Sequence, residues 1–242
     1  MKQIGVTFMA LLFPAFLFAQ DIFDVAASGT PAQVQAALAA GADANSRDAR
    51  GETVLMHAAS FTNSPRVIAM LLKAGARVQD TDRHGATALF LAAGSNALPE
   101  VTAALIDAGS DVNARDDRGE TPLMAAATNT NPDVLTLLIR KGARINDRNA
   151  DGASPLMLAA QLNPDQEVTR RLLKAGALVD DKDPSGKTAL MFAARFNPNP
   201  GVIQALLAAG ADRRLTSGEG KTAFDYAVAN PEPKSIRPLL GK

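Results

Sequence analysis

The 242-residue sequence contains no cysteine, which excludes disulfide bonds, thiolate nucleophiles and thiolate metal ligands. Tryptophan is also absent, tyrosine occurs once, and aromatic residues make up only 5% of the chain. Because 47% of the residues are nevertheless hydrophobic, the core must consist of aliphatic side chains and alanine. The chain has no net charge either, since it carries 25 basic and 25 acidic residues. This balance, without a strongly basic segment, disfavours nucleic acid as a partner.

Long hydrophobic runs are missing except at the N-terminus, where residues 4–19 are almost entirely apolar and follow a lysine. Pro14 interrupts this run, which is shorter than the ~20 apolar residues that cross a bilayer. The pattern predicts a signal peptide over residues 1–19 and a mature chain over residues 20–242. Its Leu-Phe-Ala end is an imperfect cleavage site, so an uncleaved N-terminal anchor is the alternative. A signal peptide and the lack of cysteine together indicate a periplasmic or secreted bacterial protein.

Glycine returns at a fixed interval through the rest of the chain. One series follows short apolar runs, and a second series runs in step with it a few residues later. The two series are Gly41, Gly75, Gly109, Gly142, Gly176 and Gly210, and Gly51, Gly85, Gly119, Gly152, Gly186 and Gly220. A period of 33 or 34 residues is typical of a stacked array of small units. Function is therefore expected to lie on an extended surface and not in one central site.

The unit around Gly119 illustrates the pattern within each repeat. Gly119 suits a tight turn, and Thr121, followed by a proline, has the character of a helix N-cap. Asn131, also followed by a proline, starts a second helix, and Gly142 is expected to end that helix in the left-handed conformation. The unit therefore predicts a tip followed by two antiparallel helices.

The residues of this unit resemble the ankyrin repeat. Residues 116–123 (Asp-Asp-Arg-Gly-Glu-Thr-Pro-Leu) and residues 109–113 (Gly-Ser-Asp-Val-Asn) carry the likeness, which covers nearly all of residues 21–242. The resemblance implies an all-α ankyrin repeat solenoid of about seven helix pairs with short β-hairpin tips. It also implies that a protein partner binds the concave face, which is the surface formed by the tips and the first helix of each pair.

Two features depart from the family pattern. The histidine of Thr-Pro-Leu-His is replaced, mostly by methionine as in Met124, so apolar packing is expected in place of its polar contact. The loop between paired helices carries Asn and Pro where Gly is usual. Ser64, Asn131 and Asn199 precede such prolines and are expected to cap the second helices.

Motifs for phosphate or metal binding are weak. Gly-Lys-Thr occurs at residues 186–188 and 220–222, but neither copy has the earlier glycine that a phosphate-binding loop needs. Met124, Met157 and Met191 recur in step, yet stacked helices would hold them about 8–10 Å apart, too far to share an ion. These methionines are expected to fill the core.

The two histidines, His57 and His84, have no recurring neighbour that would indicate a nucleophilic or metal site. His84 is expected to be a solvated tip residue. We therefore expect no enzymatic activity, no cofactor and no metal site. A small-molecule or metal binder of the cell envelope is the alternative from a different functional class.

The candidate binding surface combines basic and apolar side chains. Basic residues recur at and just before the tips, where they form either a stripe for an acidic partner or ordinary solvating charge. Large apolar residues end three of the first helices, where they either anchor a partner or tuck under the next loop. The candidate partner-binding residues are Arg47, Arg50, Phe61, Arg83, Arg115, Arg118, Arg148, Leu162, Lys182 and Phe196.

The function expected from the sequence is a non-enzymatic protein–protein interaction module. It would act as an adaptor, inhibitor or stabiliser of a periplasmic or secreted partner, as a monomer without a membrane span once the signal peptide is removed. A secreted effector that binds a host protein is a further alternative, because export alone does not separate the two.

Overall fold

The computed structural model describes residues 21–229 and 236–241, so the expected signal peptide lies outside the described residues. Within these ranges every regular element is a helix, and the longest helices have nine residues. The helices are α1 (Ile22–Ser28), α2 (Pro31–Ala39), α3 (Val54–Phe61), α4 (Pro65–Lys73), α5 (Ala88–Ser95), α6 (Pro99–Asp107), α7 (Pro122–Ala126), α8 (Pro132–Arg140), α9 (Pro155–Leu162), α10 (Gln166–Lys174), α11 (Ala189–Phe196), α12 (Pro200–Ala208), α13 (Ala223–Val228) and α14 (Arg237–Leu240).

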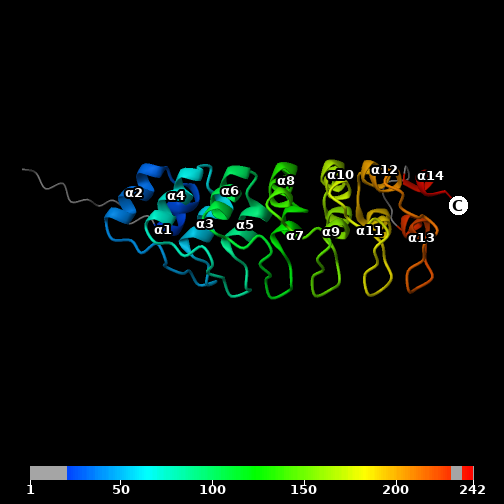
Figure 1. The fold of residues 1–242 in the computed structure, drawn as a ribbon, viewed down its shortest axis with the longest axis horizontal. Coiled ribbons are helices and arrows are strands. Elements are labelled where there is room, and N and C mark those ends of the chain that lie inside the picture. Colours follow the sequence, from blue (N-terminus) through cyan, green and yellow to red (C-terminus); the bar gives the residue numbers. More distant parts are fainter. Residues whose placement is uncertain (1–20, 230–235, 242) are drawn as a thin grey trace, which may run out of the picture.

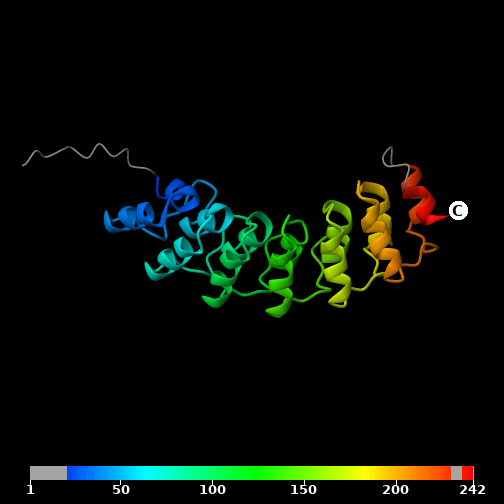
Figure 2. The same ribbon diagram turned by 90° about the horizontal axis from the view of Figure 1, so that it is seen from above.

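The helices stack in two layers along one axis. The first helix of each pair, α1, α3 and so on to α13, lies in one layer, and the second helices lie in the other (Figure 1). Loops project in a row from the layer of first helices, and the whole array is elongated and curved (Figure 2). Each helix packs against its partner in the pair and against the equivalent helix of the next pair. The expected solenoid is confirmed.

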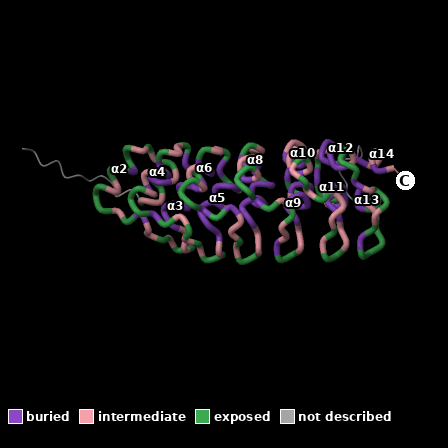
Figure 3. The backbone as a smooth tube through the Cα atoms, viewed as in Figure 1, coloured by how far each residue is buried: buried purple, intermediate pink, exposed green. Residues whose placement is uncertain are grey.

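Aliphatic side chains and alanines fill the space between the layers, where the tube of Figure 3 is buried. Leu123 on α7 and Leu138 on α8 show the pattern, since both side chains are buried. The alanine pairs of the first helices are buried as well, which lets neighbouring helices approach closely. Each buried leucine stabilises the fold by about 1.5–3 kcal/mol, but only when an adjacent unit covers it.

Helix starts follow the capping pattern of the sequence. The Thr121 hydroxyl accepts a hydrogen bond from the amide of Met124 at 3.4 Å, and a proline occupies the next position. Asn131 and Asn199 cap α8 and α12 as expected, through side-chain bonds of 2.9 and 2.8 Å. The expected cap at Ser64 is wrong: its side chain accepts no bond from α4, and its amide donates to the Thr62 hydroxyl.

The tips are tight turns where short β-hairpins were expected. In the described residues the only β-type pairings are two isolated antiparallel bridges, Arg47–Thr53 and Thr81–Thr87. An aspartate in the tip explains the difference, since its carboxylate takes backbone donors that a strand ladder would use. Asp116, for example, accepts the amides of Arg118 and Glu120 at 2.9 and 2.8 Å.

A ladder of buried asparagine amides ties successive units together at the ends of the first helices. The side-chain amide of Asn129 donates to the backbone carbonyls of Ala93 and Asn96 at 2.8 and 3.0 Å. Its side-chain carbonyl oxygen accepts a hydrogen bond from the backbone amide of Asn131. The same bonds recur one unit apart along the array. The ladder consists of Asn96, Asn129, Asn163 and Asn197, each at most 5% exposed. It explains why the loop between paired helices carries asparagine where ankyrin repeats usually have glycine.

Candidate functional site: the face of tips and first helices

Three of the candidate arginines fasten one unit to the next. Arg115 donates to the carbonyls of Gly119 and Arg148 at 2.8 and 2.7 Å and pairs with Asp147 at 2.7 Å. Arg47 makes the equivalent contacts at 2.7 Å with Gly51, Thr81 and Asp80. Arg148 repeats them with Gly152, Lys182 and Asp181.

These three guanidinium groups therefore have a structural role that the sequence analysis did not foresee. Their donors are directed to backbone carbonyls of the adjacent unit, so each one links two neighbouring tips. Lys182 continues the series with one bond of 3.0 Å to the carbonyl of Thr216. With their donors engaged in this way, they are poorer candidates for partner contact than an unpaired tip residue.

The remaining tip arginines differ among themselves. Arg50 is 65% exposed but pairs with the carboxylates of Asp48 and Glu52 at 3.4 and 3.1 Å. Arg83 and Arg118 are exposed, and within the described ranges their side chains form no hydrogen bond or ion pair. Two free arginines at separate tips do not make a continuous basic stripe.

The large apolar side chains at the ends of first helices lie in solvent. Phe61, Leu162 and Phe196 are 60%, 58% and 53% exposed, so they do not tuck under the following loops. Phe61 lies one helical turn after His57, which contacts the first tip, and Phe196 lies one turn after Phe192, which lines a pocket with tip residues. Leu162 occupies the equivalent position of α9. The three side chains are therefore on the same face as the tips. Leu162 on α9 and Phe196 on α11 belong to adjacent first helices that pack together. Phe61 on α3 is separated from them by α5 and α7.

A pocket of about 230 Å³ adjoins Phe196 on this face. Lys187, Arg195 and Lys221 contribute three positive charges to its lining, and Glu219 is the one acid there. The ammonium groups of Lys187 and Lys221 each lie 5.9 Å from the centre of the Tyr226 ring. This pocket, Phe196 in its lining and Leu162 on the adjacent first helix α9 form a surface that we call the C-terminal patch.

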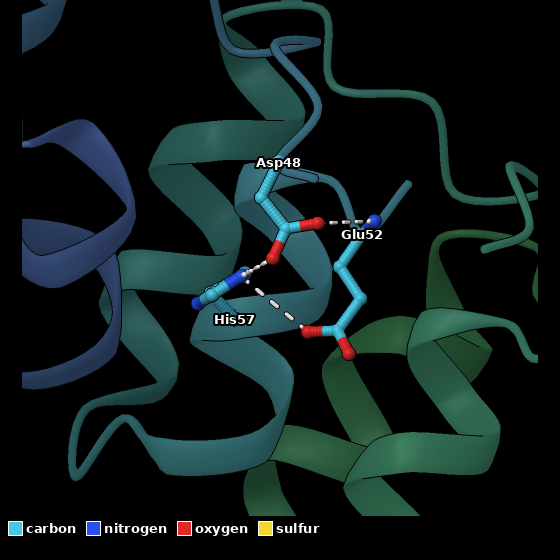
Figure 4. Close-up of side chains that lie close together, drawn as sticks. All are labelled: Asp48, Glu52 and His57. Carbon is cyan, nitrogen blue, oxygen red and sulfur yellow. Dashed lines mark hydrogen bonds and ion pairs between the residues drawn. The ribbon is translucent and has the colours of Figure 1, made fainter. Parts of the chain in front are cut away.

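Two carboxylates converge on His57, contrary to the expectation that neither histidine has a partner. The imidazole Nε2 lies 3.2 Å from Asp48 Oδ2 and 3.4 Å from Glu52 Oε2 (Figure 4). Asp48 and Glu52 belong to the first tip, whereas His57 lies on α3, and the tip turn brings them together. The sequence carried a signal for this cluster. The tip at residues 116–120 has an aspartate and a glutamate at the same two positions, Asp116 and Glu120, but the helix after it has no histidine. The histidine is therefore what sets the first tip apart.

The electrostatics of the cluster favour a charged Asp48. Partial burial alone would raise the pKa of this carboxyl, but hydrogen bonds from the Glu52 amide, His57 and Arg50 outweigh burial and lower the pKa below its ordinary value. The side chains of His57, Asp48 and Glu52 are 15%, 20% and 14% exposed. The centre of the Phe23 ring on α1 lies 4.9 Å from the centre of the imidazole, with the two rings tilted by 58°.

The recurring methionines have the core role expected for them. Met124, Met157 and Met191 are at most 2% exposed and lie at the third position of successive first helices. The two Gly-Lys-Thr segments are likewise accounted for by the fold, since Thr188 and Thr222 cap α11 and α13.

The opposite face of the array also carries a groove, which runs over the second helices α6, α8 and α10. Arg171 pairs with Asp133 at 2.6 Å and with Glu167 at 3.0 Å in its floor, and the bond to Asp133, followed by that to Glu167, raises the pKa of Arg171 against the effect of burial. The charge of Arg171 is therefore paired within the groove. In the part of the chain that the structure describes, no helix has the length and apolar character to cross a membrane.

A protein-family model described as "Ankyrin repeats (3 copies)" matches the sequence over three overlapping ranges, residues 22–116, 93–183 and 156–242. The chain belongs to the ankyrin repeat family. Its structure is similar to the crystal structure of the human ASB11 ankyrin repeat domain, with a TM-score of 0.79 and 25% sequence identity. The match covers 91% of this chain and 96% of that domain. No curated protein matches the sequence. Ankyrin repeats generally mediate protein–protein interactions, and this ankyrin repeat chain exposes the large apolar side chains of Phe61, Leu162 and Phe196 at the ends of first helices.

Proposed function

We propose that this ankyrin repeat protein is a non-enzymatic binding module whose protein partner docks on the C-terminal patch. The exposed apolar pair Leu162 and Phe196 supports this proposal most directly. Both side chains are more than half exposed, whereas the other large apolar residues of the first helices, apart from Phe61 and Val228, are buried or half-buried. Exposed apolar groups beside a pocket are typical anchors for a partner.

The charges around the pocket indicate the chemistry of the partner. Lys221 pairs with Glu219 at 2.7 Å, which leaves Lys187 and Arg195 as the lining charges without an ion pair in the described structure. The patch therefore favours an acidic segment that also carries an apolar side chain. An interface of about 800 Å² per partner would extend over three or four units and would include the free guanidinium of Arg118. Because the scaffold is already ordered, association needs little reordering of the backbone.

Affinity capture with paired variants tests this proposal. The bait is the tagged protein, and the extract comes from the envelope of the cells that make it. The variant Leu162→Ser with Phe196→Ser is expected to lose the partner, whereas Leu178→Ser, which changes an equally exposed leucine elsewhere, is expected to keep it. Circular dichroism of each variant establishes that the fold is intact. A partner retained by the double variant would contradict docking on the C-terminal patch.

A second pair of variants separates binding from scaffold roles among the arginines. Arg118→Glu is expected to weaken capture without changing stability, because its side chain is exposed and unpaired in the described structure. Arg115→Glu is expected to lower stability, because it removes two bonds to the adjacent unit and one within its own tip. Equal effects of both variants on stability would show that the two arginines do not divide these roles.

The proposed location is the periplasm or the exterior of the cell. Support comes from the apolar segment of residues 4–19 and from the absence of cysteine. Mass spectrometry of the protein purified from its own cells tests this proposal. A mature chain that starts near Gln20 is expected, and an intact N-terminus would indicate a retained anchor or no export.

A further inference from the structure

The cluster of Asp48, Glu52 and His57 is not required by the ankyrin fold. At the place of His57 the later first helices, α5 to α13, carry Leu91, Ala125, Leu158, Phe192 and Tyr226. Tyr226 shows what that position contacts, because its hydroxyl lies 3.1 Å from the Ser217 hydroxyl of its own tip. Only the first of these tips combines an imidazole with two carboxylates. A feature confined to one unit of an otherwise regular array asks for an explanation other than folding.

We propose that Asp48, Glu52 and His57 bind a zinc ion. Zinc bonds of about 2.0–2.2 Å to nitrogen and oxygen in tetrahedral geometry place neighbouring ligand atoms about 3.3–3.5 Å apart. The distances from His57 Nε2 to the two carboxylate oxygens, 3.2 and 3.4 Å, lie within about 0.1 Å of this spacing. The three ligand atoms all lie within 4.8 Å of one another, so one ion can contact them together. Three protein ligands leave the fourth position for water.

The surroundings hold the ligands in place without a metal. The second oxygen of Asp48 accepts the amides of Arg50 and Glu52 at 2.8 and 2.9 Å, which fixes the orientation of the carboxylate (Figure 4). The ring of Phe23 lies 4.9 Å from the imidazole and restricts its movement. Such contacts around a ligand typically change metal affinity by about 10–100-fold.

The ligand set favours zinc over other ions. An imidazole nitrogen is a poor ligand for calcium or magnesium, which take oxygen ligands. Thiolates and thioethers, which select copper(I), are absent from the cluster. Two carboxylates and one neutral imidazole suit zinc, and cobalt(II) can replace zinc as a coloured probe of the same geometry.

Arg50 competes with the proposed zinc ion for the carboxylates of Asp48 and Glu52. Its guanidinium lies 3.4 Å from Asp48 Oδ2 and 3.1 Å from Glu52 Oε2, so it offsets one of the two negative charges in the metal-free protein. Its side chain is 65% exposed and can move into solvent when an ion enters. Removal of this charge is therefore expected to strengthen zinc binding.

Calorimetric titration of the full chain with zinc chloride tests the proposal, and His84→Gln is the matched control. This control removes the other histidine of the chain, which is exposed at the next tip. We expect one zinc per chain, an affinity unchanged in His84→Gln, and a loss of more than ~10-fold in His57→Gln. Arg50→Gln is expected to bind more tightly than the natural protein.

Cobalt(II) absorption provides the second readout. Intense visible bands of tetrahedral cobalt are expected in the natural protein and in His84→Gln, and they are expected to disappear in His57→Gln. If His57→Gln does not fold, Glu52→Gln replaces it, with the same expected loss. No zinc binding by the natural protein, or equal binding by the two histidine variants, would overturn the proposal. Both readouts use metal alone, so they do not depend on the protein partner.

Discussion

Single polar side chains determine how the units of this array join. The amide of Asn129 and the guanidinium of Arg115 both bond to carbonyls of a neighbouring unit, but Asn129 is 3% exposed and the Arg115 side chain is 39% exposed. Burial strengthens the consequence of losing a bond, since a buried carbonyl without a donor cannot turn to water. We therefore expect the asparagine ladder to contribute more to stability than the arginines.

Substitution of one ladder residue tests this order. Asn129→Ala leaves the carbonyls of Ala93 and Asn96 and the amide of Asn131 without their partner. A loss of about 2–4 kcal/mol in the free energy of unfolding is expected. Urea denaturation measures it, with Arg115→Ala as the comparison, for which a loss of about 1 kcal/mol or less is expected. A larger loss in the arginine variant would reverse the assignment.

The carboxyl of Asp48 links stability to pH. Its pKa is lowered in the folded protein, so the charged carboxyl stabilises the fold above its ordinary pKa of 3.8. This contribution is lost as the pH falls below 3.8 and through the lowered pKa of the folded state. Asp48→Asn should therefore show a smaller drop in stability between about pH 7 and about pH 3 than the natural protein. Urea midpoints at both pH values, measured with a chelator present, provide the test. Identical drops in the two proteins would contradict a role for this carboxyl.

At the scale of the elements, the two series of glycines differ in how closely a neighbouring unit approaches them. Gly176 follows a second helix at φ +97°, and a Cβ added there would meet nothing within 4 Å. Gly186 lies in a tip at φ +76°, and an added Cβ would lie 2.8 Å from the amide nitrogen of Gly218 in the next tip. The first glycine is needed for its backbone conformation alone, and the second also for the close approach of two tips.

A pair of alanine variants separates these requirements. Gly176→Ala is expected to cost about 1–2 kcal/mol, which is the penalty for a side chain in the left-handed region. Gly186→Ala should cost more, because backbone atoms of the next tip must move and the bond from Gly218 to Ser185 at 2.8 Å is strained. The difference is measured by urea denaturation of both variants. Equal losses would indicate that neighbouring tips separate without cost.

At the scale of the whole molecule, the contacts are between neighbours along the array. Each unit packs on the units before and after it, and the same hydrogen bonds recur from one junction to the next. Stability is therefore expected to be a sum over units and junctions. A unit can be removed if the two faces that then meet are equivalent to those that were separated.

Deletion of residues 82–115 removes α5 and α6 and brings α7 against α3. Asn129 would then face the carbonyls of Ala59 and Thr62, which Asn96 contacts in the full chain. We expect a folded, shorter array that keeps its helical circular dichroism per residue and unfolds at lower urea concentration. Loss of all helical signal would show that the array folds only as a whole.

The helices and their ends could be predicted from the sequence, whereas the contacts between units could not. The positions of Thr121, Asn131 and Gly142 predicted helix starts and ends because capping depends on local geometry. The asparagines of the ladder repeat with the same period, but the bonds they form depend on carbonyls of another unit, which the sequence does not place. For the same reason the sequence showed Arg115 as a free charge and His57 as a histidine without partners. The exposure of Leu162 and Phe196 was left open because it depends on the path of the following loop.

Hydrogen–deuterium exchange of the protein with and without its captured partner tests the central claim most directly. If the partner docks on the C-terminal patch, protection on binding is expected in α9 and α11 and in the tips at residues 183–187 and 217–221. The second helices α6, α8 and α10, which line the groove of the opposite face, should exchange as in the free protein. Protection confined to those second helices would contradict the account.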